Sequence, residues 1–379
     1  MASGGNEYYG NSAFLLPRAY LNDGHGKLVK KNDAFNNVFV TASVVAACDF
    51  NEDKNVDLFI GGRAVPWEYG KIPRSCLMQN DGTGRFIDVT DKYAPGLANA
   101  GFVKHAVWVD IDNDKDKDLV LSLEWDGICV FINNKGVFTK RYITDKKGWW
   151  NFVMPCDLDN DGDMDFIAGN EGLNSRLTAS EKEPVRFYYY DFDGNGKKEQ
   201  LITYYLQGRE TTFASKSDLE KQMPGLKKKF LYAADFAKAS IKEIFGADKL
   251  AKAKVFSADF FSSAMLINDG KSNFTVKALP WEAQFTSYHD AIPVNVNKDM
   301  LPGILLAGNF YDNNIQMGRY DADFGTLLVN KGKGNLVCEK LNGLTIRGEV
   351  RHIRPISIGD KKALIIARNN DSLEVISFH

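Results

Sequence analysis

Four short acidic segments have residue types and a spacing that could bind a hard cation. The clearest runs from Asp157 to Asp165, with a carboxylate at positions 1, 3, 5, 7 and 9, and the apolar run Phe166-Ile167-Ala168 follows at once. Calcium prefers six to eight oxygen ligands at about 2.3–2.6 Å, which closely spaced carboxylates in a tight loop can supply. The spacing therefore predicts a calcium-binding loop.

The same nine-residue frame occurs three more times, each time before an apolar run typical of a strand. A single acidic run is usually a solvated turn, whereas four copies in register with strand-like runs predict up to four structural Ca²⁺ sites. The candidate ligands at positions 1, 3, 5, 7 and 9 are Asp49, Asn51, Asp53, Asn55 and Asp57; Asp110, Asp112, Asp114, Asp116 and Asp118; Asp157, Asp159, Asp161, Asp163 and Asp165; and Asp191, Asp193, Asn195, Lys197 and Glu199.

An EF-hand is the main competing interpretation, because its loop opens with a similar acidic pattern. An EF-hand also needs a glutamate at position 12 and a helix on each side. Position 12 is apolar or small in every copy here, as at Ile60 and Leu121, and the flanking runs are strand-like. The EF-hand interpretation is therefore excluded.

Two further segments depart from the frame. A fifth copy reads Asn295, Asn297 and Asp299, with Gly303 in place of the last carboxylate, and residues 357–361 carry no frame at all. We expect no metal at either. The first two loops carry lysine where glycine is usual, which should weaken them.

The elements that must position these loops form a repeat. Asn-Asp-Gly or similar sequences at 21–26, 79–84, 267–270 and 329–334 predict tight hairpins, because these residues accept positive φ at low cost. A unit of about 40–60 residues with two strands, an acidic loop and an outer hairpin fits a propeller blade. The predicted inner strand pairs are near 38–63, 103–124, 151–170, 186–208, 290–309 and 350–368.

The predicted fold is therefore an all-β propeller of six or seven four-stranded blades. It forms a single domain over residues 1–379, in which the N-terminal hairpin segment and the C-terminal strand complete one blade. Residues 216–254 instead have helical periodicity and predict a helical insertion. The insertion would act as a lid or partner surface, or only as a packing element.

The acidic loops resemble those of FG-GAP (VCBS) repeats, the module of the integrin α-subunit propeller. Residues 61–66, 169–176 and 318–322 resemble the CRTAC1-like VCBS-repeat proteins of Bacteroidetes. The resemblance implies a calcium-binding propeller within a larger extracytoplasmic protein, on the outer-membrane surface, in the periplasm or secreted. No catalytic activity is firmly attached to that family, so the resemblance implies a fold and a metal rather than a reaction.

Composition narrows the function classes. The chain has 379 residues and a net charge of −2, which gives no sign of the basic surface that nucleic acid requires. No apolar stretch is long enough to span a membrane. The first five residues lack signal-peptide features, so we expect a leader and upstream sequence to have been removed. We expect five free cysteines and a monomer.

The blade geometry separates two faces. Acidic loops join first to second strands and share one face, whereas segments leaving the second strands emerge on the other. Arginine, asparagine, aspartate and tryptophan gather there, which suits a polar ligand such as a sugar, or a protein. Alternatively, these side chains satisfy backbone carbonyls and neighbouring blades. The candidate ligand-binding residues are Arg63, Arg74, Trp125, Asn174, Arg176, Arg209, Asn309, Arg319, Asp321 and Arg368.

These patterns together predict a calcium-stabilised, extracytoplasmic binding or adhesion scaffold for a glycan or protein ligand, without catalysis. The histidines form no metalloprotease spacing, and the sequence has no nucleophile elbow or P-loop. We therefore assign no catalytic residue. The alternative is a polysaccharide lyase or glycoside hydrolase on the same fold, because carboxylates are plentiful.

Overall fold

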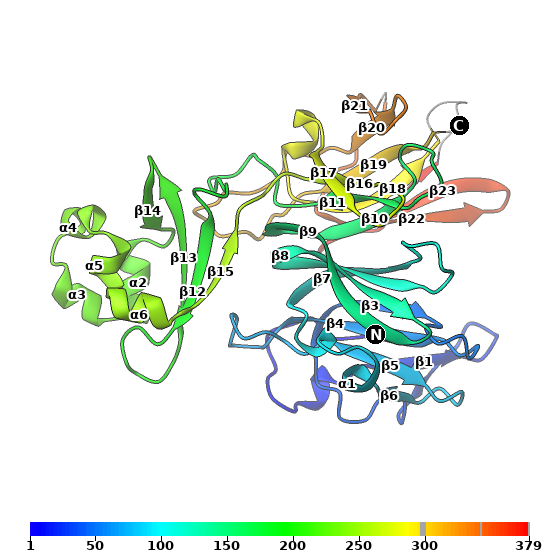
Figure 1. The fold of residues 1–379 in the computed structure, drawn as a ribbon, viewed down its shortest axis with the longest axis horizontal. Coiled ribbons are helices and arrows are strands. Elements are labelled where there is room, and N and C mark those ends of the chain that lie inside the picture. Colours follow the sequence, from blue (N-terminus) through cyan, green and yellow to red (C-terminus); the bar gives the residue numbers. More distant parts are fainter. Residues whose placement is uncertain (296–300, 342, 378–379) are drawn as a thin grey trace.

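The computed structural model describes residues 1–295, 301–341 and 343–377 (Figure 1). Strands make up 43% of the chain and helices 12%, which confirms the prediction of a mainly β protein. The sheets are antiparallel and are built largely from strands that are consecutive in the sequence. None of the helices in the described residues has the length and apolar character needed to traverse a bilayer.

Five sheets form the body of the molecule. Their first strands follow one another side by side in the order β3, β7, β10, β18 and β22. The sheets are β3 (Thr41–Cys48), β4 (Asp57–Ala64), β5 (Cys76–Asn80) and β6 (Phe86–Asp88); β7 (Phe102–Val109), β8 (Asp118–Asn134) and β9 (Val137–Trp149); β10 (Phe152–Cys156), β11 (Asp165–Gly169), β16 (Ala264–Asn268) and β17 (Phe274–Ala278); β18 (Tyr288–Val294), β19 (Gly303–Gly308), β20 (Thr326–Asn330) and β21 (Leu336–Glu339); and β22 (Val350–Ile358), β23 (Lys361–Arg368) and β24 (Glu374–Ser377).

All six predicted inner strand pairs exist as antiparallel hairpins, but only five belong to this series of sheets. Over the described residues no closed propeller is detected, and the blade number stays a prediction. Three of the five sheets have four strands. The second has three, because the long strand β8 bends near Trp125 and pairs with β7 in its first part and β9 in its second.

The pair predicted at 186–208 lies in an insertion that interrupts the third sheet. After β11 the chain leaves the body, forms a separate sheet and a group of helices, and returns as β16 (Figure 1). The inserted sheet has the order β14-β13-β12-β15, so β12 is paired on both sides and cannot face its neighbours as a first strand does. Its strands are β12 (Val185–Tyr190), β13 (Glu199–Leu206), β14 (Arg209–Thr212) and β15 (Lys254–Ala258).

A group of short helices covers the side of the inserted sheet that faces away from the body (Figure 1). They are α2 (Lys216–Gln222), α3 (Gly225–Lys229), α4 (Ala233–Lys238), α5 (Ile241–Phe245) and α6 (Ala247–Lys252). The apolar residues at helical spacing, such as Leu219 and Ile244, form one buried cluster with Tyr188 of the sheet. The helical segment of the sequence therefore packs on a sheet of its own rather than on the body.

An aromatic cluster joins the insertion to the body. Trp125, on β8, is 4% exposed, stacks on Phe187 of β12 at 5.6 Å, and donates its indole N–H to the Tyr69 hydroxyl at 2.8 Å. Gly70 has a φ of +114°, and a Cβ there would approach the Tyr189 ring to 2.6 Å. Close contact with the insertion thus requires glycine at this position.

In the described residues the strands nearest the two termini lie in separate sheets, so closure of one blade by both termini stays a prediction. Strand β1 (Ala19–Asn22) pairs with β2 (Leu28–Lys31) in a separate two-stranded sheet, and in the described residues the last sheet has only β22, β23 and β24. The N-terminal segment packs on the first sheet instead, through buried residues that include Phe35 and Val40. The remaining helical turns are η1 (Ala13–Leu15), α1 (Thr90–Tyr93), η2 (Leu97–Asn99) and η3 (Trp281–Gln284).

Replacing Trp125 with alanine tests the aromatic junction. We expect Trp125→Ala to lower the free energy of unfolding by about 3–5 kcal/mol, because it empties a tryptophan-sized volume between insertion and body. Trp281→Ala is the matched control: Trp281 is 62% exposed, and its loss should cost under about 1 kcal/mol. Equal effects of the two variants in urea denaturation would contradict a packed junction.

Candidate functional site

Each acidic loop connects the first two strands of a hairpin, which brings its carboxylates together. Three loops gather carboxylates whose oxygens lie within 4.8 Å of one another. The groups are Asp110, Asp112 and Asp118; Asp157, Asp159 and Asp165; and Asp191, Asp193 and Glu199. The first loop has asparagine at position 3 and shows no such grouping in the described part of the chain.

The carboxylate at position 9 is buried and fixed by two backbone donors. In the third loop, Asp165 accepts the N–H of Leu158 at 2.9 Å on one oxygen and the N–H of Asn268 at 2.7 Å on the other. The first bond closes the loop, and the second ties it to the next strand of the sheet, β16. Asp57 and Asp118 repeat both bonds in their own sheets.

Burial gives these carboxylates a high cost of ionisation. It raises the pKa of Asp57, Asp118 and Asp165 to about 6 each, since a charged carboxylate loses hydration when it is enclosed. In the fourth loop, Glu199 takes the same position and accepts the N–H of Phe192 at 2.6 Å. The four loops therefore share the bond that closes the loop, and among the described residues the second bond is recorded for the first three.

Position 6 explains a difference between the loops. Its backbone N–H donates to the carboxylate at position 1 in each loop, for example from Gly162 to Asp157 at 3.1 Å. This requires a positive φ, which is +95° at Gly162 but also +71° at Lys54 and +82° at Lys115. A positive φ is sterically unfavourable for lysine but not for glycine. The backbone at position 6 is therefore strained in the first two loops and unstrained in the last two.

The loops suit a cation, because some of their carboxylate oxygens have no other partner. Among the described residues, Asp110 Oδ1 and Asp159 Oδ1 are buried and accept no hydrogen bond. Burial and the neighbouring carboxylates also raise the pKa of Asp112 and Asp159. A hard cation bound to these oxygens would satisfy them and offset their mutual repulsion, which is the chemistry calcium supplies in oxygen-lined loops.

The loops also connect adjacent sheets. The carbonyl of Leu158, at position 2 of the third loop, accepts a hydrogen bond from the Asn330 amide of the fourth sheet at 2.7 Å. The corresponding carbonyl of Phe50 accepts from Asn133 in the second sheet at 2.9 Å. A loop that unfolds would therefore lose contacts with the neighbouring sheet as well as with its own.

Side chains of a different kind gather at the other end of the sheets. Four of the five first strands have a register shift near their start, where a β-bulge turns an extra residue out of the pairing. The residues skipped by the pairing are Ser43, Lys104, His289 and Arg351. Bulges at equivalent places in four sheets bring polar side chains to one end of the body.

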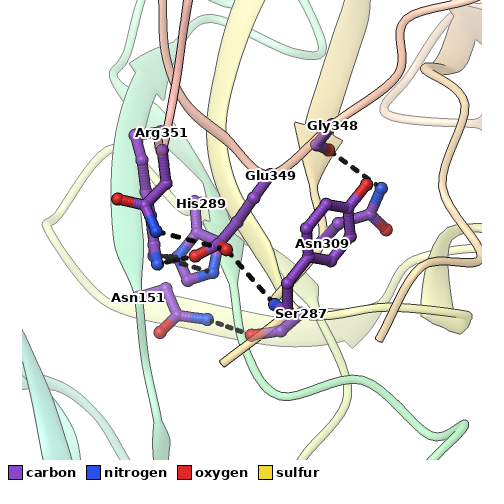
Figure 2. Close-up of polar contacts among 9 residues, drawn as sticks. Asn151, Ser287, His289, Asn309, Gly348, Glu349 and Arg351 are labelled. Atoms are coloured by element: carbon purple, nitrogen blue, oxygen red, sulfur yellow. Dashed lines mark hydrogen bonds and ion pairs between the residues drawn. The ribbon is translucent and has the colours of Figure 1, made fainter. Parts of the chain in front are cut away.

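Figure 2 shows part of this polar end, where β18 and β22 begin. Arg351 forms an ion pair with Glu349, whose side chain is 1% exposed, and its guanidinium lies 3.2 Å from His289 Nε2. Burial lowers the pKa of His289 well below its usual range, and the positive charges of Arg351, Lys104 and Arg63 add to the effect. His289 is therefore neutral at physiological pH, and three cationic side chains lie near it.

Several of the predicted ligand-binding residues have structural partners. Asn309 is 2% exposed, and its amide nitrogen donates to the carbonyl of Asp323. It also donates to the carbonyl of Gly348 (Figure 2). Asn174 donates to the Phe285 carbonyl at 3.1 Å. Trp125 is buried in the aromatic junction. The alternative that such residues satisfy carbonyls and neighbouring elements fits these three.

The predicted arginines divide in the same way. Four have partners: Arg74 pairs with Asp88 and Asp91, Arg176 donates to the Tyr204 hydroxyl, Arg209 donates to the carbonyls of Lys238 and Ala239, and Arg368 donates to the Ser372 carbonyl. Arg319 lies over the Tyr311 ring and 3.7 Å from Asp321, both charged side chains being exposed. Arg63 forms no hydrogen bond or ion pair with any described residue.

Arg63 instead lines a cavity of about 560 Å³ at the polar end. Trp67, Tyr69, Lys104 and Glu124 also line it, and Gln200 of the inserted sheet forms part of its wall. Lys104 and Gln200 were not among the predicted site residues. Sequence alone places Lys104 within a strand, and only the bulge turns it toward the cavity; no signal in the sequence relates Gln200 to it.

Comparison with known proteins supports the repeat. Residues 110–168, which contain the second and third acidic loops, match the FG-GAP-like repeat family. No curated protein matches the chain. Among solved structures it is similar to the V. cholerae biofilm matrix protein Bap1, with 13% sequence identity and a TM-score of 0.26 over 95% of this chain and 68% of that one. The FG-GAP part of the predicted resemblance is thus confirmed for this segment, and the CRTAC1-like part stays a prediction.

Removing calcium tests the role of the acidic loops. We expect EDTA to lower the melting temperature by about 5 °C or more, because a cation that binds only the folded loops stabilises the fold. Asp159→Asn should reduce the gain from added calcium without destabilising the metal-free protein, since it removes a repelling charge. Asp235→Asn, in helix α4, is the control and should change neither value. A calorimetric scan indifferent to EDTA would refute a structural metal.

Removing Arg351 tests the polar end. Arg351→Met leaves the buried Glu349 carboxylate without its partner and should cost about 3 kcal/mol of unfolding free energy. The double variant with Glu349→Gln should recover part of the loss. Arg347→Met removes an exposed arginine nearby and should change stability by less than about 0.5 kcal/mol. Urea denaturation of the four proteins measures these differences, and an unchanged Arg351→Met would show that the ion pair is dispensable.

Proposed function

We propose that this protein is a calcium-stabilised, propeller-like scaffold that binds a glycan or protein ligand outside the cytoplasm, without catalysing a reaction. The observation that carries the proposal is the separation of two polar sites at opposite ends of the same hairpins. The acidic loops lie at one end and are suited to a cation. The cavity lies at the other, where Arg63 and Lys104 form no hydrogen bond or ion pair with the described residues.

The position of the cavity suits a binding role. Strand β4 ends and strand β7 begins there, so Arg63 and Lys104 are presented by rigid sheets rather than by loops alone. Rigid presentation reduces the entropy lost on binding. The acidic loops hold adjacent sheets together at the far end, and calcium bound there would keep the cavity walls in register.

A non-catalytic role is favoured by the charges in the cavity. Glycosidases need two carboxyl groups facing each other across the scissile bond. In the part of the chain that the structure describes, Glu124 is the single carboxylate in the cavity lining. The extracytoplasmic setting is supported by the FG-GAP-like match over residues 110–168 and by the millimolar calcium available outside cells, which weak sites need.

The test is a glycan array and a polysaccharide digest with the calcium-loaded protein. Binding without new reducing or unsaturated ends is the expected result. Cleavage would replace the proposal with an enzyme of lyase or hydrolase type. If no glycan binds, pull-down with extracellular proteins is the second arm, and failure of both arms would overturn the binding function.

A further inference from the structure

The cavity at the polar end combines an aromatic surface with positive charge. Trp67 stands on its rim and is 71% exposed, although large apolar side chains are usually buried. Its φ is +68°, a left-handed conformation that costs a bulky residue steric energy. The backbone is held there by a hydrogen bond from the Trp67 N–H to the Asn6 side chain at 3.0 Å. The fold therefore keeps the indole exposed at a steric cost.

A second aromatic ring extends this surface. Tyr9 is 70% exposed, and its ring meets the Trp67 ring edge to face at 6.3 Å. Flat, exposed aromatic rings at a polar cavity suit the apolar faces of pyranose sugars, because the ring C–H groups pack on the aromatic face while the hydroxyls stay solvated. This arrangement favours a sugar chain over a compact ion as the occupant.

The charges of the cavity favour an acidic sugar. Arg63 and Lys104 come from different sheets, and in the described residues neither forms an ion pair or hydrogen bond that would occupy it. Arg63 is exposed, whereas Lys104 and Glu124 are half-buried. The two cations outnumber Glu124, which is the one acidic side chain among the described residues that line the cavity. Arg351 lies near Arg63, but the Glu349 carboxylate offsets its charge.

We infer that the cavity binds a uronic-acid residue of an acidic polysaccharide, with the sugar ring on Trp67 and its carboxylate between Arg63 and Lys104. Arginine can hold a carboxylate through two parallel N–H···O bonds, and lysine adds a mobile donor. Glu124 accepts sugar hydroxyls and disfavours a ligand of higher charge density, such as a polysulfate. This inference rests on the proposed binding function and narrows its ligand class.

Binding is measured by affinity electrophoresis in gels containing polygalacturonate, alginate or hyaluronan, each beside its carboxyl-reduced form. Reduction converts the carboxylate to an alcohol and leaves the sugar chain intact. We expect retention by at least one acidic polymer, at least tenfold weaker retention by its reduced form, and weakening at high salt. Dextran sulfate supplies sulfate without uronic acid and should retain the protein more weakly.

Variants locate the site. Arg63→Met and Lys104→Met should each weaken binding about tenfold, and Trp67→Ala about fivefold or more. Arg85→Met and Trp281→Ala remove an exposed arginine and an exposed tryptophan away from the cavity lining and should leave retention unchanged. Melting temperatures close to that of the parent protein show that each variant is folded.

The possible outcomes separate this inference from the broader function. If an acidic polymer retains all three cavity variants as strongly as the parent protein, the assigned site is wrong but the protein still has a binding function. If the protein binds neutral glycans, sulfated glycans without uronic acid, or a protein ligand instead, only the uronic-acid inference is overturned. Absence of any ligand in this screen, the glycan array and the protein pull-down would overturn both.

Discussion

The structure depends on a carboxylate buried at the last position of each acidic loop. Asp165 closes its own loop, bonds to the next strand through Asn268, and lies close to Asp159, whose Oδ1 accepts no hydrogen bond from the described residues. Buried charge is tolerated only when paired or bound to a metal. Hairpin geometry, sheet pairing and suitability for a cation are therefore linked in one group, and Asp57 and Asp118 form the same two backbone hydrogen bonds in the first two sheets.

The hairpins have two ends that differ in sequence constraint: the acidic-loop end and the opposite, bulged end. At the loop end, the four loops that carry the frame place a carboxylate at positions 1 and 9, because the backbone and the carboxylates must converge there. At the opposite end the first strands are bulged, and Lys104, His289 and Arg351 differ in chemistry although their places are equivalent. Variation is tolerated at this end, which is where a scaffold acquires specificity.

The limits of sequence reasoning follow from the range of the interactions involved. Acidic loops such as Asp157 to Asp165 could be predicted because most of the hydrogen bonds that shape them are local. The bonds from Asn268 and Asn330 come from other strands and could not be predicted. The hairpin at 186–208 was predicted correctly as a hairpin and wrongly as a member of the central series, because its frame does not say which strand pairs beside it. Trp125 and Asn309 are residue types that often occur in binding surfaces, and only their tertiary contacts show that they are buried. Lys104 reaches the cavity because of a β-bulge, and the residue types in the sequence do not predict that bulge.

The insertion also bears on how the chain folds. Ala168 on β11 pairs with Ala264 on β16, so the third sheet is completed only after the whole inserted unit has been synthesised and its ends brought together. The hairpins on either side join residues close in sequence and can form early, whereas this pairing has a high contact order. Addition of β16 and β17 to the third sheet is therefore expected late in folding. If the insertion first forms its own sheet and helix cluster, the loop that must close becomes effectively shorter.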